Sequence, residues 1–138
     1  MNILVIDGQG GRVGRQLVEE ILRKAPEADL MAVGTNGIAT TSMAKGGAKK
    51  IATGENAVLV ACRTADIIVG PQGIVVADAL FGEVTPKMAA AVGQSEAVKI
   101  LLPFHCCNLT IIGTQNLTMA ELVEKAAEEV CAILCGGS

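Results

Sequence analysis

The sequence predicts a three-layer α/β domain whose mostly parallel sheet has five or six strands, ordered 3-2-1-4-5 with a sixth strand at one edge. Short continuous apolar runs, typical of strands buried on both faces of a parallel sheet, alternate along the chain with segments of helical periodicity. A glycine-rich turn follows the first apolar run and leads directly into a helix. With 138 residues, the chain is expected to form one domain, residues 1–138, with a substantial core.

The first unit, residues 2–24, is the one around which the others are arranged. Residues 3–6 predict a buried strand, and apolar residues at four-residue spacing from Val13 onward predict an amphipathic helix that Pro26 ends. A strand, a glycine turn and a helix form the opening unit of a dinucleotide-binding fold, in which backbone amides at the helix N-terminus receive a phosphate. The turn fits two spacings, G-x-x-G-x-x-G (Gly8, Gly11, Gly14) or G-x-G-x-x-x-G (Gly8, Gly10, Gly14).

The charges around this turn act in opposite directions. Arg12 and Arg15 favour a bound phosphate, because cations in a first helical turn oppose the helix dipole unless an anion lies there. The alternative is a tight turn with two solvated arginines. Asp7 would repel a pyrophosphate, so a ligand would be held with Mg²⁺ or would not be a dinucleotide. We favour the simpler role for Asp7, which is to accept hydrogen bonds from the amides of the glycine loop.

The later elements follow in alternation. Further apolar runs predict strands at residues 29–33, 49–52, 66–69, 98–102 and 109–112. Helices are predicted at residues 38–45 and from the TGEN tetrad to about residue 62. A third helix is predicted at residues 86–92, with Thr85 as its N-cap, Pro86 as its first residue and Gly93 as its end. The last helix follows a capping box of Thr118 and Glu121. The nearly uncharged run 74–81 is either central core or a subunit interface.

Because the carboxyl ends of parallel strands share one rim, the loops at residues 7–14, 35–36, 53–56, 70–73 and 105–108 are expected to converge there as a ligand crevice. Thr35 and Asn36 equally suit a turn and a helix N-cap, and Thr53 is a plausible N-cap with Glu55 behind it. The second strand lacks the following acidic residue that NAD-binding chains use for the ribose. The predicted cofactor-binding residues are Asp7, Gly8, Gly10, Gly11, Arg12, Val13, Gly14, Thr35, Asn36, Thr53, Gly54, Glu55, Asn56, Gly70, Pro71, Gln72 and Gly73.

Composition excludes several classes of protein. The chain has no Trp or Tyr and two Phe, so bases have almost no aromatic side chains on which to stack, and its net charge of −3 gives no electrostatic footprint for nucleic acid or a membrane surface. No signal peptide or membrane span is evident, which predicts a cytoplasmic protein with reduced thiols. Cys106 and Cys107 are adjacent and His105 is the single histidine, so no metal site is expected, and spacing does not show whether either thiol is reactive.

The runs VIDGQGGRVG, AVGTNGIAT, ATGENA, DIIVGPQGIVVADALFGEVTPKMA and ILLPF together resemble a family of small bacterial proteins, the domain-of-unknown-function family numbered 3842. The resemblance covers nearly the whole chain and implies a Rossmann-like fold in a bacterial cytosol. It carries over no activity and no catalytic residue. The glycine loop alone also resembles that of short-chain dehydrogenases, but their Tyr-x-x-x-Lys pair cannot exist in a chain without tyrosine.

Three functional hypotheses follow from different classes. The first is a sensor or regulatory module that binds a nucleotide or an NAD(P)-like dinucleotide, with phosphate on the glycine loop. The second is a homo-oligomeric scaffold without a ligand, assembled through residues 74–81. The third is an enzyme acting on a small phosphorylated or carboxylated metabolite, with Asp7, Glu55 or His105 as acid or base.

Overall fold

A computed structural model describes residues 1–103, 108–114 and 116–136. Five parallel strands form one sheet in the order β3-β2-β1-β4-β5, which confirms the predicted order. The strands are β1 (Asn2–Asp7), β2 (Asp29–Gly34), β3 (Lys50–Thr53), β4 (Ile67–Pro71) and β5 (Val98–Leu102).

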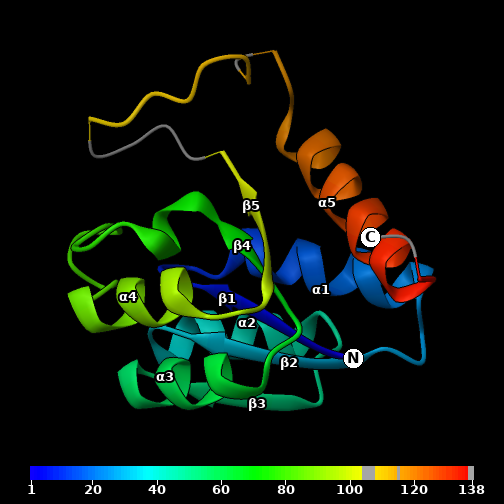
Figure 1. The fold of residues 1–138 in the computed structure, drawn as a ribbon, viewed down its shortest axis with the longest axis horizontal. Coiled ribbons are helices and arrows are strands. Elements are labelled where there is room, and N and C mark those ends of the chain that lie inside the picture. The colour runs from blue at the N-terminus through cyan, green and yellow to red at the C-terminus, as the bar shows by residue number, and fades with distance from the viewer. Residues whose placement is uncertain (104–107, 115, 137–138) are drawn as a thin grey trace.

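Helices cover both faces of this sheet, so the sheet is the middle one of three layers (Figure 1). One face carries α1 (Arg12–Lys24), α2 (Gly37–Lys45) and α5 (Met119–Leu134). The other face carries α3 (Glu55–Thr64), the short 3-10 helix η1 (Gln72–Val75) and α4 (Pro86–Gln94). None of the described helices has the length and apolar character needed to span a membrane.

The central position of β1 explains its continuous apolar sequence. Asn2–Asp7 pairs with Asp29–Gly34 on one side, and residues 3–5 pair with 67–69 on the other. Helices cover both faces of the strand, so its four apolar residues are at most 2% exposed. The crossovers run in opposite directions from β1, so the gap between the carboxyl ends of β1 and β4 is the topological switch point, where open α/β sheets usually bind ligands.

Three predicted helix starts are confirmed. Asn36 caps α2 by accepting a hydrogen bond from the Ala39 amide at 2.9 Å. Thr85 caps α4, with Pro86 in its first turn. Thr118 and Glu121 form the capping box of α5, whose glutamates 124, 128 and 129 face outward while Val123, Ala126 and Val130 are buried.

Other boundaries differ from the prediction. Gly70 and Pro71 belong to β4 instead of a turn, because β5 extends far enough to pair with both. Thr53 is the last residue of β3 and does not cap α3; Gly54 precedes the helix, and the Thr53 hydroxyl lies 2.7 Å from that of Thr40 instead. Gly93 does not end α4, which continues to Gln94.

The predicted sixth strand is also wrong. Residues 109–112 are irregular or in turns and pair with no described strand. Its apolar residues are not buried as a strand inside the sheet would be, since Ile112 is 83% exposed and Leu109 and Ile111 are half-buried. The predicted rim loop 105–108 lies outside the described residues, apart from Asn108, and so do His105, Cys106 and Cys107.

Candidate functional site

Asp7, the last residue of β1, organises the glycine loop. Its Oδ1 accepts a hydrogen bond from the Gly8 amide at 2.8 Å, and its Oδ2 accepts one from the Gly14 amide at 2.6 Å. The prediction that Asp7 caps the turn is therefore confirmed. Burial raises the pKa of this carboxyl and outweighs the two backbone hydrogen bonds, which act to lower it.

The glycines of the loop serve close packing. A Cβ on Gly11, whose φ is +72°, would lie 2.7 Å from the Cα of Ala39, and a Cβ on Gly14 would lie 2.6 Å from the Met43 sulfur. A Cβ on Gly10 would meet no atom within 4 Å. The structure therefore requires the spacing Gly8, Gly11, Gly14, because Gly11 and Gly14 lie directly against α2 and Gly8 lies against Thr35 and Leu80.

A turn from residue 78 to residue 84 covers the switch point. Asp78, Leu80 and Phe81 all have left-handed backbone conformations, with φ of 67°, 58° and 56°. The Leu80 side chain is 4% exposed and lies over Gly8 and Gly73, which follow β1 and β4. This turn, hereafter the covering turn, fills the crevice that the fold would otherwise leave open.

Glu83 of the covering turn joins three loops through one carboxylate oxygen. Its Oε1 accepts hydrogen bonds from the Gln9 amide at 2.8 Å, the Thr35 hydroxyl at 2.7 Å and the Asn36 side-chain amide at 2.8 Å. Partial burial acts to raise the pKa of Glu83, but these three hydrogen bonds outweigh it and hold the pKa below its ordinary value. The carboxylate therefore stays ionised beside the end of β2, where the sequence alone offered no acidic residue.

A groove of about 960 Å³ opens between the glycine loop and α2. Its charges are separated along α2. Glu83 lies at the N-terminal end, bonded to Asn36, whereas Lys45 is in the last turn and Arg15 lies against Gly46 just beyond it. Nine residues of helix separate those ends by roughly 13 Å. The groove is lined by Gln9, Arg15, Asn36, Gly37, Ile38, Thr41, Ser42, Lys45 and Glu83.

The structure brings together only part of the predicted site. Asp7, Gly8, Thr35 and Asn36 gather around Glu83 and the glycine loop. The other predicted loops do not line the groove: residues 53–56 end β3 and begin α3, and residues 70–73 end β4 and begin η1.

Sequence reasoning did not assign binding roles to several lining residues. Glu83 was missed because it lies 47 residues after Asn36, although a charge next to Gly82 at the end of an apolar run was an available signal. Thr41 and Ser42 lie inside a predicted helix and carry no motif, and the sequence shows of Arg15 only that its charge favours an anion. These groups become neighbours through the packing of α1 against α2.

Of the proposed acid and base residues, Asp7 and Glu55 lie at the ends of β1 and β3, which β2 separates, and His105 lies outside the described residues. Asp7 is 5% exposed and both its oxygens accept backbone amides, while Glu55 lies in the first turn of α3. Within residues 1–103, 108–114 and 116–136, no three His, Cys, Asp or Glu side chains are placed to hold a metal ion.

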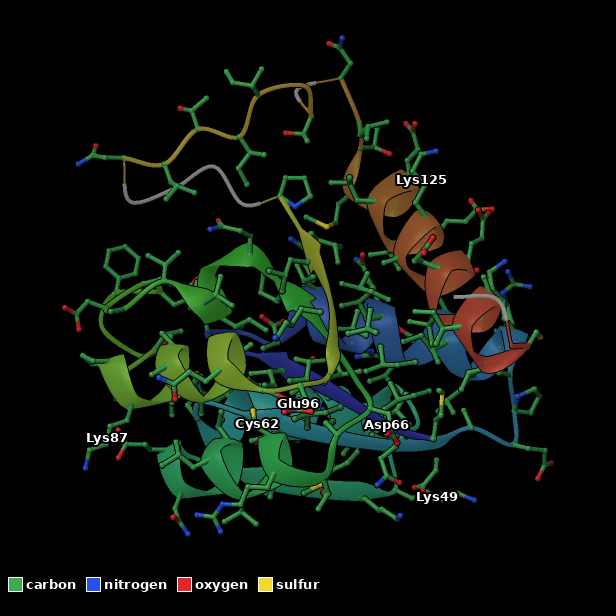
Figure 2. All side chains as sticks on the ribbon, viewed as in Figure 1. Lys49, Cys62, Asp66, Lys87, Glu96 and Lys125 are labelled. Carbon is green, nitrogen blue, oxygen red and sulfur yellow. The ribbon has the colours of Figure 1, made fainter. Side chains whose placement is uncertain are left out.

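A second cavity, of about 460 Å³, lies between the C-terminal parts of α3 and α4. Cys62 and Glu96 both line it (Figure 2). Burial raises the pKa of the Cys62 thiol, which disfavours the nucleophilic thiolate. The groove beside α2 is therefore the stronger candidate site.

Comparisons with known proteins agree with this fold. The family model described as Domain of unknown function (DUF3842) matches residues 2–134. No curated protein has a detectable sequence match to the chain. Among solved structures, the chain is similar to a dodecameric FMN-dependent UbiX-like decarboxylase from Escherichia coli O157:H7, with a TM-score of 0.53 and 17% identity over 99% of this chain and 95% of that one.

The glycine geometry predicts different effects for two neighbouring substitutions. In Gly8→Ala, the added Cβ would lie 2.6 Å from the Thr35 hydroxyl oxygen and 2.7 Å from a Leu80 methyl, so we expect the free energy of unfolding to fall by about 1–3 kcal/mol. The matched control Gly10→Ala meets no atom within 4 Å and should change it by less than about 0.5 kcal/mol. Denaturant unfolding of both variants tests this; equal losses would contradict the packing described.

The lowered pKa of Glu83 predicts a pH-dependent contribution to stability. This contribution is present above the ordinary glutamate pKa of 4.5 and is lost as the pH falls through the lower pKa of the folded protein. Asp7 acts with the opposite sign, because its raised pKa means that the folded state binds the proton more tightly.

The difference in unfolding free energy between the wild type and Glu83→Gln reports mainly on the first effect, since Asp7 is common to both proteins and the Glu83 charge is the last of the causes that raise its pKa. We expect this difference to shrink as the pH is lowered below about 4.5 in a series of urea titrations. A difference that stays constant down to the acid limit of folding would show that Glu83 is not held ionised by its three donors.

Proposed function

Because the chain belongs to the Domain of unknown function (DUF3842) family, whose description names no reaction, we propose its function from the groove: it binds a nucleotide or another small molecule that carries a phosphate. The observation that carries this proposal is the gathering of two cations and two hydroxyls in one open groove beside the glycine loop. Arg15 and Lys45 supply the charge, and Thr41 and Ser42 supply the hydroxyls.

The cations are free to receive an anion. Arg15 has a contact of 3.5 Å with Glu19, but both side chains are about half exposed, and such surface pairs contribute little. A guanidinium has five N–H donors and binds a phosphate through two at once. Arg15 can therefore exchange its contact with Glu19 for a ligand at small cost.

The glycine loop supports the same ligand class at its outer edge. Three of its inner amides are occupied, since Gly8 and Gly14 donate to Asp7 and Gln9 donates to Glu83. The amides of Gly10, Arg12 and Val13 donate to no residue in the described part of the chain. These first-turn amides are thus available to a further acceptor group of a ligand whose phosphate lies with the groove cations.

The solved relative adds support of a general kind. Its dependence on FMN, a cofactor that carries a phosphate, agrees with the ligand class proposed for the groove. NAD(P), FMN and mononucleotides are therefore all candidates, with or without Mg²⁺. We assign the ligand a regulatory or sensory role, because Glu83, the one acidic side chain among the described residues that line the groove, is held by three hydrogen-bond donors.

Ligand stabilisation tests this proposal. A thermal-shift panel of NAD(P), FMN, mononucleotides and inorganic phosphate should contain at least one compound that, at 100 times its dissociation constant, stabilises the fold by about 2.7 kcal/mol. Arg15→Ala and Lys45→Ala should each lower the affinity for that compound by roughly tenfold or more, as expected for the loss of a charge-assisted hydrogen bond.

Lys125→Ala is the matched control. Lys125 is an exposed lysine on α5, away from the groove (Figure 2), and its removal lowers the net charge equally. If no compound stabilises the protein, or if Lys125→Ala weakens binding as much as Lys45→Ala does, the groove does not bind a phosphate.

The covering turn favours a second function, self-association. The predicted core-or-interface run divides here, because Ile74 and Leu80 are at most 4% exposed whereas Phe81 is 97% exposed. An aromatic side chain in open solvent favours a partner surface. The similar solved structure is dodecameric, which supports a homo-oligomer in general, and we assign the contact to this turn because of Phe81.

Native mass spectrometry tests the assembly. The wild type should form a defined oligomer, and Phe81→Asn should shift it toward the monomer, because asparagine tolerates the left-handed backbone but removes the aromatic surface. Ile112→Asn, which removes another exposed apolar side chain, serves as the control. A wild type that stays strictly monomeric at high concentration would exclude the assembly.

A further inference from the structure

We propose that Glu83 recognises the ribose of the ligand, so that the groove takes a ribose phosphate or ribonucleotide in preference to its deoxy analogue. This inference rests on the proposed function and names the sugar that the ligand carries. Glu83 would accept hydrogen bonds from the vicinal hydroxyls, while the phosphate lies toward Arg15 and Lys45. No sequence motif marks this residue, because its carboxylate reaches the site from the crossover between β4 and β5.

The first argument is the unequal use of the two carboxylate oxygens. Oε1 accepts all three hydrogen bonds, from Gln9, Thr35 and Asn36. Oε2 accepts none from the residues that the structure describes, although Glu83 lines the groove. An ionised carboxylate has about four acceptor sites and no donor. The fixed Oε1 therefore orients a second oxygen that can only be satisfied by water or by a ligand's donors.

The second argument is the polarity of the groove. An anion placed beside Glu83 would be repelled by its carboxylate, so a phosphate belongs at the far end of α2, with Lys45 and Arg15. The end at Glu83 instead suits a group that donates hydrogen bonds without carrying negative charge. A molecule with a pair of hydroxyls at one end and a phosphate at the other meets both requirements, and a ribose phosphate is such a molecule.

The third argument is the position of the carboxylate in the sheet. Glu83 bonds to Thr35 and Asn36, the two residues directly after β2. In dinucleotide-binding α/β folds, an acidic side chain near this point holds the ribose 2′-hydroxyl. Residues 35–45, which follow β2 in this chain, include no Asp or Glu. The covering turn instead places the Glu83 carboxylate at the same end of the strand.

The experiment compares AMP, 2′-deoxy-AMP and inorganic phosphate by isothermal titration on the wild type and on Glu83→Gln. The glutamine keeps a carbonyl oxygen for the three existing donors but replaces the second acceptor by an NH₂ group. We expect the wild type to bind AMP about tenfold or more tightly than 2′-deoxy-AMP. Glu83→Gln should bind the two nucleotides equally, and its affinity for inorganic phosphate should not fall, because the substitution removes a negative charge from the groove.

The outcomes separate this inference from the proposed function. If AMP and 2′-deoxy-AMP bind the wild type equally and Arg15→Ala weakens both, the groove binds phosphate but Glu83 does not recognise ribose. If Glu83→Gln keeps the preference for AMP, the assignment to Glu83 is overturned. If none of the three probes binds, the inference about ribose is overturned, and the proposed function fails as well if the thermal-shift panel contains no stabilising compound. The wild-type comparison of the two nucleotides remains decisive even if Glu83→Gln does not fold.

Discussion

The geometry of this protein depends on a buried carboxylate at the end of its central strand. Asp7 accepts hydrogen bonds from the amides of Gly8 and Gly14, which are six positions apart in the sequence. These bonds draw the glycine loop back against β1. Burial of a charged group is costly unless backbone donors surround it, and here two of them do. Because the loop is closed in this way, α1 starts at Arg12 and lies close enough to α2 for Gly14 to meet Met43.

A second set of contacts covers the usual ligand opening of such a sheet. The opening between β1 and β4, which open α/β sheets commonly use, is covered by Leu80 and tied down through Glu83. The accessible hollow is displaced toward α2, onto a helix that carries hydroxyls in its middle and a lysine at its end. The fold is therefore an open, doubly wound α/β sheet whose open groove lies beside the glycine loop instead of above it.

The local features of this structure and its strand order were predictable, but the contacts between distant loops were not. The apolar run of β1, the caps at Asn36 and Thr85 and the role of Asp7 each depend on residues close together in the chain. Those signals survive in sequence because a cap or a buried central strand imposes residue types directly.

The exact limits of strand pairing and the convergence of loops were not predictable, because they depend on residues that are distant in the sequence. The run at residues 109–112 has the composition of a strand but finds no neighbouring strand, while Gly70 and Pro71 look like a turn and yet pair with β5. Glu83 reaches the end of β2 only because the covering turn folds back over Gly8. The polar groups of the groove are thus assembled by tertiary packing.

The backbone of the covering turn has a final consequence. Left-handed conformations cost non-glycine residues about 1–3 kcal/mol each, and three of the four residues from Asp78 to Phe81 adopt them. This shape is consequently imposed from outside by the pocket that holds Leu80 and by the donors that hold Glu83. Cut free as a short peptide, the same residues would abandon it, so the turn's form is a property of the whole folded chain.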